Sequence, residues 1–169
     1  MVAIIPGTQA PDLSLKTTGG VTLKLSKILQ SESMVLLAFF KVSCLACQLA
    51  FPYLERLHRS YPQRAIWGVS QDDLDATTSF ARTYGCSFPI LLDEDLSLTV
   101  KYGLIIVPSI FLVDKSQIVQ VTSEGFVKDD LEQINKSLSE GSGKPLKALF
   151  TEADYVPPLR PGCASKQPA

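Results

Sequence analysis

Hydrophobic and polar residues alternate in two short stretches near the start of the chain, at 13–15 and 21–25, on either side of Gly19 and Gly20. Strict alternation is typical of a strand with one buried face, and glycines between two such stretches favour a tight turn. Residues 34–40 are apolar without interruption, as expected for a central parallel strand that is covered on both faces. The pattern predicts an N-terminal β-hairpin followed by a buried strand.

The pattern changes to helical spacing directly after this strand. A helix of about 45–60 is predicted, because apolar residues recur there every three or four positions: Ala46, Leu49, Ala50, Tyr53, Leu54 and Leu57. Residues 65–69 predict a second buried strand. Asp72 or Asp73 can cap the helix that follows, which is expected to stop near Gly85.

Short strands and helices continue through the second half of the chain. The elements expected there are a strand at 88–92, a helix at about 96–102, a strand at 105–113 interrupted early by Pro108, its hairpin partner at 117–122, and a last helix marked by Leu131, Ile134 and Leu138. This order predicts an α/β fold with a central mixed β-sheet flanked by helices and an N-terminal β-hairpin extension.

The chain length of 169 residues favours one domain, which we place at 1–145. After Gly141-Ser142-Gly143 the pattern is lost. Residues 146–169 contain Pro157, Pro158 and Pro161 and are expected to form an irregular, Pro-rich C-terminal tail.

The net charge is −1 and 46% of the residues are hydrophobic, so neither a nucleic acid nor a membrane surface is expected as a partner. No apolar stretch approaches the length that spans a bilayer. Residues 1–7 lack the basic region and the apolar core of a signal peptide, which favours the cytoplasm as the location.

Cys44 and Cys47 stand three residues apart, where the strand at 34–40 gives way to the helix. Helical residues at this spacing have Cβ atoms about 5–6 Å apart, whereas a disulfide needs roughly 3.5–4.5 Å. A bridge therefore requires Cys44 near the N-cap, where unpaired N–H groups and the helix dipole favour a thiolate. A four-residue disulfide loop stabilises a fold by only about 1.9 kcal/mol, against about 3 kcal/mol for fifteen residues. The pair suits a redox couple better than a crosslink.

Two other interpretations compete with redox chemistry: a pair of inert buried thiols, or half of a zinc site. Zinc usually takes four ligands, and the remaining candidates are Cys86, Cys163 and His58. None of these makes a second close pair with another. We therefore favour the redox couple and expect neither a metal nor a cofactor.

Several motifs around these cysteines form a recognisable set: Ala10-Pro11-Asp12-Leu13, the Cys44–Cys47 pair followed by Pro52, Val107-Pro108, and Gly125 before the last helix. Over roughly residues 5–140 the chain resembles the redoxin branch of the thioredoxin-like superfamily. This branch includes the TlpA/ResA-type thiol-disulfide oxidoreductases and the AhpC/TSA peroxiredoxins. The resemblance implies a thioredoxin-like fold, an active-site helix beginning at the cysteines, and a cis-proline loop at Val107-Pro108 that faces them.

The chain departs from the family pattern at three positions. Ser43 stands where a Trp commonly precedes the first cysteine, and Ala38 and Ala50 stand where thioredoxins and TlpA/ResA-type proteins carry an acidic residue. Both usual carboxylates for moving a proton off the buried thiol are thus missing. The nearby polar residues, Lys41, Glu55 and His58, are expected to be solvated surface groups.

The resemblance leaves two alternatives beside dithiol exchange. A peroxiredoxin needs a Thr or Ser three residues before its peroxidatic cysteine, and Lys41 occupies that position before Cys44. Thiol-dependent peroxidase activity through Cys44 is the first alternative, and a non-catalytic, thioredoxin-like binding module is the second.

The expected roles follow from these considerations. Cys44, nearest the helix start and the solvent, is the expected nucleophile, and the buried Cys47 resolves the mixed disulfide. The partners are protein or small-molecule disulfides and a thiol reductant. The resemblance implies that Val107 and Pro108 bind the substrate, with neighbouring backbone groups left free for an extended peptide.

Two further cysteines are candidate auxiliary thiols. Cys86 is expected in a loop before Phe88-Pro89. Cys163 is expected to be exposed in a mobile tail, where it could relay to the active site or pair with Cys86.

Overall fold

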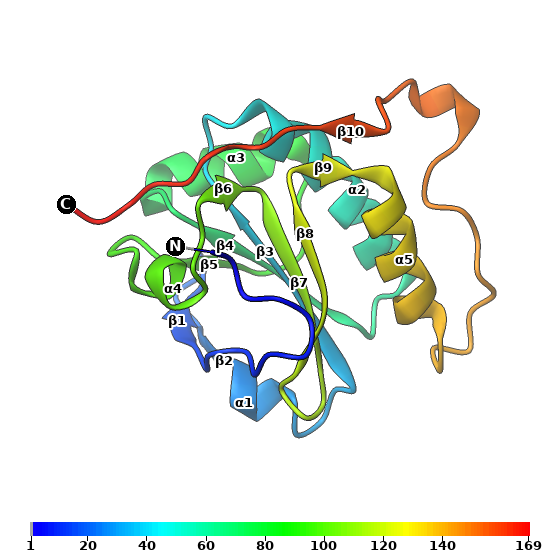
Figure 1. Cartoon of the computed structure of the whole chain (residues 1–169), viewed down its shortest axis with the longest axis horizontal. Coiled ribbons are helices and arrows are strands. Elements are labelled where there is room, and N and C mark those ends of the chain that lie inside the picture. The colour runs from blue at the N-terminus through cyan, green and yellow to red at the C-terminus, as the bar shows by residue number, and fades with distance from the viewer. Residues whose placement is uncertain (1) are drawn as a thin grey trace.

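The computed structural model describes residues 2–169, and a five-stranded mixed sheet lies at its centre (Figure 1). The strand order is β5-β4-β3-β7-β8, with β3, β4 and β5 parallel and β7 and β8 antiparallel to their neighbours. The bounds are β3 Met34–Phe40, β4 Ala65–Ser70, β5 Ile90–Leu92, β7 Ser109–Asp114 and β8 Val119–Glu124. The predicted central mixed sheet is confirmed.

The apolar run of β3 supplies both faces of this sheet. Leu36, Ala38 and Phe40 belong to one hydrophobic cluster, whereas Val35, Leu37 and Phe39 belong to the other. Successive side chains of a strand point to opposite faces, so an uninterrupted apolar strand is the sequence that two covered faces require. All six side chains are fully buried.

Helices cover both faces. Helices α2, α3 and α5 supply buried residues to the cluster that contains Phe40, and α1 and α4 supply residues to the cluster that contains Phe39. The bounds are α1 Leu25–Ile28, α2 Leu45–Ser60, α3 Leu74–Tyr84, α4 Ser97–Lys101 and α5 Lys128–Ser139. The N-terminal hairpin is present as strands β1 Ser14–Lys16 and β2 Thr22–Lys24, which pair antiparallel as predicted.

Local signals in the sequence account for the helix that follows β4. The Asp73 side chain accepts a hydrogen bond from the backbone N–H of Ala76 at 2.9 Å, so Asp73 is the N-cap of α3. Gly85 ends the helix in the left-handed region at φ 69°, a conformation that glycine adopts without steric cost. The predicted start and end of this helix are confirmed.

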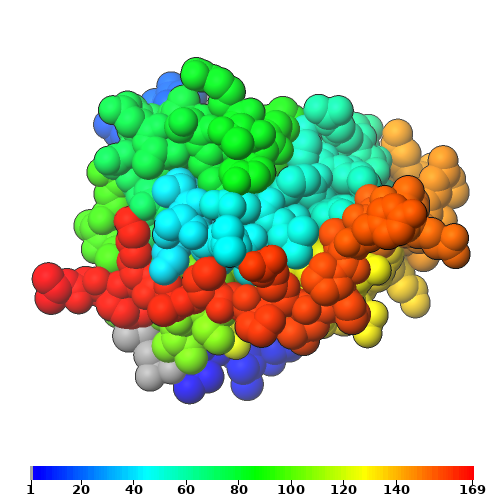
Figure 2. Space-filling view, turned by 90° about the horizontal axis from the view of Figure 1, so that it is seen from above, coloured from blue at the N-terminus to red at the C-terminus, as the bar shows by residue number. Residues whose placement is uncertain are grey.

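The C-terminal segment is more ordered than the irregular tail that we expected. It contains a short 3₁₀ turn, η1 Glu152–Asp154, and two short strands, β10 Leu159–Arg160 and β11 Cys163–Ala164. Strand β10 pairs with β9 Phe126–Val127, and β11 pairs with β6 Ile106–Val107. Figure 2 shows this segment, in orange and red, running across one face of the molecule beside the start of α2. The domain boundary at residue 145 stays a prediction.

Among residues 2–169, no helix combines the length and the hydrophobicity that a membrane span requires.

Candidate active site

Cys44 is the N-cap of α2, as the spacing of the two cysteines predicts. Its backbone is extended, at φ −85° and ψ 118°, and its sulfur accepts a hydrogen bond from the backbone N–H of Cys47 at 3.3 Å. The carbonyl of Cys44 accepts the next helical bond, from the N–H of Gln48 at 3.0 Å. The sulfur therefore satisfies one of the N–H groups that a helix start leaves unpaired, at the positive end of the helix dipole.

These contacts stabilise the Cys44 thiolate. The thiol of Cys47 donates a hydrogen bond to the Cys44 sulfur, which lowers the pKa of Cys44 to about 5 against the opposing effect of burial. The thiol of Cys163 and the backbone N–H of Cys47 act in the same direction. A free cysteine has a pKa of about 8.5, so Cys44 is the group of the site that is ionised at neutral pH.

Cys47 has the opposite character. Burial raises the pKa of its thiol far above the ordinary value, and the hydrogen bond and negative charge of Cys44 raise it further. The first thiol is therefore a thiolate and the second a protonated donor. This asymmetry is what a nucleophile and a resolving thiol need.

The Val107-Pro108 loop faces the cysteines. The peptide bond between these residues is cis, as the resemblance implies, and the thiol form of Cys44 donates to the carbonyl oxygen of Val107 at 3.3 Å. The sheet brings them together, because Ser109 at the start of β7 pairs with Phe39 at the end of β3. The strand that leads into α2 and the strand that follows Pro108 thus meet at one edge.

The accessibility expected for Cys44 is wrong. Its side chain is fully buried, like that of Cys47, although we expected it to face solvent. The physical reason is the C-terminal segment, which places Cys163 opposite Val107 and against the Cys44 sulfur. The expectation for Cys163 is corrected with it, because this residue is half-buried in a paired strand instead of exposed in a mobile tail.

Among residues 2–169, the side chains of the three polar residues near the cysteines form no hydrogen bond with either sulfur, although the backbone N–H of Lys41 opposes the rise in the pKa of Cys47. Lys41 donates from Nζ to the carbonyl oxygen of Ala164 at 2.5 Å. Glu55 was expected at the surface but is buried, because it accepts from the backbone N–H and the hydroxyl of Ser87 and pairs with Arg59. His58 is half-buried, and its Nδ1 has no hydrogen-bond partner. Within residues 2–169, no carboxylate is hydrogen-bonded to Cys44 or Cys47.

Cys86 lies apart from the other thiols. It directly follows the left-handed Gly85 at the end of α3, and its N–H bonds to the carbonyl oxygen of Ala81. Burial raises the pKa of its thiol to about 12, and the negative charge of Glu55 acts in the same direction. Cys86 is therefore a protonated thiol at neutral pH, and the hydrogen-bonded group of thiols consists of Cys44, Cys47 and Cys163.

Comparison with known proteins places these features in a family. The model of the AhpC/TSA family matches residues 6–122, which is more than half of the chain. The chain belongs to the AhpC/TSA family. This match includes the N-terminal hairpin, both cysteines of the Cys44–Cys47 pair and the Val107-Pro108 loop. It ends before the C-terminal segment.

Individual proteins and solved structures are similar to the chain over most of its length. The chain is 30% identical over 138 residues to the thioredoxin-like protein YneN of Bacillus subtilis, covering 78% of this chain and 79% of YneN. It is 26% identical over 137 residues to the thiol-disulfide oxidoreductase ResA of Bacillus thuringiensis, covering 79% and 78%. The thioredoxin domain of a thiol-disulfide oxidoreductase from Bacteroides vulgatus superposes with a TM-score of 0.70 at 21% identity, covering 80% of this chain and 99% of that domain. The thioredoxin-like fold is thereby confirmed.

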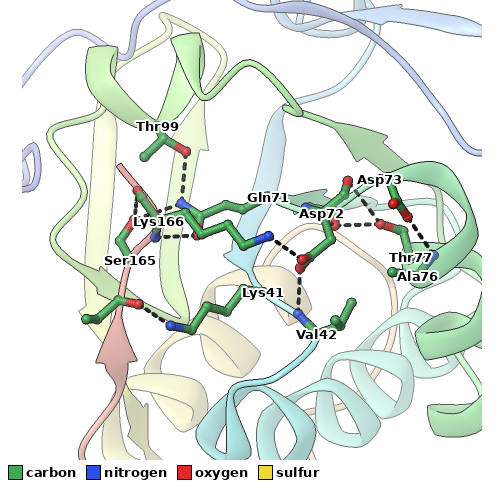
Figure 3. Close-up of polar contacts among 12 residues, drawn as sticks. Lys41, Val42, Gln71, Asp72, Asp73, Ala76, Thr77, Thr99, Ser165 and Lys166 are labelled. Atoms are coloured by element: carbon green, nitrogen blue, oxygen red, sulfur yellow. Dashed lines mark hydrogen bonds and ion pairs between the residues drawn. The ribbon is translucent and has the colours of Figure 1, made fainter. Parts of the chain in front are cut away.

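Sequence reasoning missed one group of residues, those that hold the C-terminal segment beside the site. Gln71, Asp72 and Lys41 bind its backbone and side chains (Figure 3). The prolines and Gly162 indicate an extended segment capable of close approach, but nothing in their spacing indicates where it docks.

We predict that the reduced protein shows one thiolate titration with a midpoint near pH 5, because hydrogen bonds from Cys47 and Cys163 stabilise the Cys44 thiolate. The thiolate is present above this pH and is lost as the pH falls through it. Ultraviolet thiolate absorbance across the pH range measures the midpoint. Cys44→Ser is expected to abolish the step, and Cys163→Ala to move it upward by removing one donor. A Cys44 midpoint near that of a free thiol would contradict the assignment.

Proposed function

We propose that the protein is a thiol-disulfide oxidoreductase in which Cys44 is the nucleophile and Cys47 the resolving thiol. The observation that carries this proposal is the Cys44 sulfur at the start of α2, which accepts the Cys47 N–H and has a pKa lowered to about 5. The substrates are protein or small-molecule disulfides, and a thiol reductant regenerates the dithiol. The names of the ResA relatives support the same activity.

The first half-reaction uses the thiolate. Cys44 attacks one sulfur of the substrate disulfide, a Cys44–substrate disulfide forms, and the second substrate sulfur leaves as a thiolate. Cys44 thereby loses its negative charge. Since that charge and the hydrogen bond to it both raise the pKa of Cys47, the resolving thiol becomes more acidic when it is needed.

The second half-reaction requires a base for Cys47. No carboxylate hydrogen-bonds its thiol within residues 2–169, so the departing substrate thiolate, with a free pKa of about 8.5, is the base that we assign. Cys47 then attacks the Cys44 sulfur, forms the Cys44–Cys47 disulfide and releases the other substrate sulfur. This route needs no acidic residue at the positions held by Ala38 and Ala50.

Val107 and Pro108 belong to the strand edge at which we expect a substrate peptide to bind. Pro108 has no N–H, so the loop offers backbone hydrogen bonds on its Val107 side. An extended peptide that pairs with β6 brings its sulfur beside Cys44, because the Val107 carbonyl oxygen already lies 3.3 Å from the Cys44 sulfur.

We expect Cys47→Ser, in a Cys163→Ala background, to accumulate a mixed disulfide with a cystine-containing peptide, because the first attack proceeds and the resolving thiol is missing. Cys44→Ser in the same background should form no such complex, since Cys47 is buried and protonated. Mass spectrometry under non-reducing conditions measures both, and reductant should release the peptide. Trapping through Cys47 in the Cys44→Ser variant would reverse the assigned roles.

Hydrogen peroxide should be a poor substrate. Lys41 occupies the position three residues before Cys44, and its ammonium group bonds to the Ala164 carbonyl oxygen instead of orienting a peroxide. Stopped-flow oxidation of the reduced protein measures the rate, with a free thiol at equal thiolate concentration as the reference. A second-order rate far above this reference would favour the peroxidase alternative.

A further inference from the structure

The C-terminal segment pairs with the strand that precedes the cis proline. Cys163 and Ala164 of β11 lie antiparallel to Val107 and Ile106 of β6, and the N–H of Ser165 continues the pairing to the carbonyl oxygen of Ile105 at 2.9 Å. An extended peptide that adds a strand to an exposed sheet edge binds in this way. The chain thus supplies its own peptide at the edge that we assign to substrates.

The register between β11 and β6 places Cys163 next to the site of the Cys44 sulfur. Cys163 lies directly opposite Val107, whose carbonyl oxygen contacts the Cys44 sulfur at 3.3 Å. Cys163 packs against the hydrophobic cluster that contains both active-site cysteines, and its thiol is one of the groups that lower the pKa of Cys44. A substrate sulfur in a docked peptide would occupy this same place.

Two glycines permit the close approach of the segment. A Cβ atom built on Gly162 would lie 2.5 Å from the Val107 carbonyl oxygen and would collide with the Ile106 side chain. One built on Gly125, at φ +80°, would lie 2.9 Å from the carbonyl oxygen of Arg160. Side chains at these positions would force the segment away from β6, so the backbone is fitted to the edge.

Polar side chains that directly follow β3 and β4 anchor the end of the segment (Figure 3). The buried Gln71 donates to the Ser165 hydroxyl at 2.7 Å and accepts from the Lys166 N–H at 3.0 Å. Lys166 pairs with Asp72 at 2.5 Å, and Asp72 also accepts from the N–H of Val42 at 2.8 Å, just before the active-site helix.

Two further hydrogen bonds hold the residues on either side of Ser165 and Lys166. Lys41 binds the carbonyl oxygen of Ala164, and the Gln167 side chain donates to the carbonyl oxygen of Leu104 at 2.8 Å. Together with the pairing of β10 with β9, these bonds fix the segment before and after Cys163, and Cys44 is fully buried.

From this arrangement we propose that residues 159–167 are a built-in substrate mimic and that Cys163 is a third redox-active thiol, which exchanges with the Cys44–Cys47 disulfide. The proposal rests on the proposed function, because that activity generates the oxidised couple. An external disulfide then has to displace the segment from β6 before it can reach Cys44.

The exchange is an isomerisation and needs no further oxidant. Cys163 loses its proton and attacks the Cys44 sulfur, the Cys44–Cys163 bond forms, and the Cys44–Cys47 bond breaks. The electron pair of the broken bond passes to the Cys47 sulfur, which takes up a proton equal to the one that Cys163 released. The buried Cys47 strongly favours its protonated form, so the product is a neutral thiol.

Disulfide mapping tests the exchange. The Cys86→Ala protein, which keeps the three clustered thiols, is oxidised with one equivalent of diamide, held at neutral pH, quenched with acid, alkylated and digested without reductant. We expect an intramolecular Cys44–Cys163 peptide beside the Cys44–Cys47 peptide. A protein in which Cys163 is always alkylated and only the Cys44–Cys47 bond appears would overturn the proposal.

Loosening the anchors tests the substrate mimic. Lys166→Ala combined with Gln167→Ala removes the ion pair to Asp72 and the bond to Leu104 while keeping Cys163. We expect iodoacetamide to label Cys44 about fivefold faster in the reduced double variant. This factor corresponds to a decrease of ~1 kcal/mol in the free energy needed to move the segment away from Cys44. Lys144→Ala, which removes an equal charge from an exposed residue outside the segment, is the matched control. Equal labelling rates in the double variant and the control would contradict a covering role for the segment.

One comparison separates this inference from the proposed function. If Cys163→Ala reduces a cystine-containing peptide and the Cys44–Cys163 bond never forms in Cys86→Ala, the inference fails and the proposed function stands. If the bond forms and neither protein reduces disulfides, the proposed function fails, although the exchange between the three thiols is supported.

Discussion

The hydrogen bond from the Cys47 N–H to the Cys44 sulfur is the contact on which the site depends. It exists because α2 begins at residue 45, which makes Cys44 the N-cap and places its sulfur among the unpaired N–H groups of the first turn. Strand β3 fixes that starting point, since its two apolar faces bury it at the centre of the sheet. The same helix start leaves Cys47 one turn inside, where burial keeps its thiol protonated.

The C-terminal segment changes what this site can do. A dithiol at an open edge would react with any disulfide that reaches it, whereas here β11 occupies the edge beside Cys44. The segment also stabilises the thiolate form of Cys44, because the Cys163 thiol is one of the donors that lower the pKa of Cys44. Covering and activation of the nucleophile are thus coupled through one residue, and displacement of the segment exposes Cys44 while removing one of its hydrogen bonds.

The sequence predicted those features that depend on local pattern. The uninterrupted apolar run at 34–40 identified the central strand, and the spacing of Cys44 and Cys47 placed the first cysteine at the helix start. It did not predict the burial of Cys44, because that burial comes from a segment more than a hundred residues away in the chain. Pro161 and Gly162 indicate an extended segment, but its docking position depends on Gln71, Asp72 and Lys41, which are ordinary polar residues in the sequence. The burial of Glu55 was not predicted for a similar reason, because its partner Ser87 lies in a loop that is distant in the sequence.

The reduction potential of the Cys44–Cys47 couple tests the account most directly. Stabilisation of the thiolate favours the dithiol over the disulfide. The pKa of Cys44, about 5, lies between that of the reactive cysteine of thioredoxin, about 7, and that of DsbA, about 3.5, and the reduction potential is expected between theirs. The Cys86→Ala/Cys163→Ala protein lacks one of the donors that lower this pKa but keeps both contributions of Cys47. Equilibrated with glutathione buffers, it should still show one reversible two-electron transition between about −270 and about −120 mV. A potential below that of thioredoxin, or the absence of a reversible transition, would contradict the assignment of Cys44 and Cys47 as a thiolate-based redox couple.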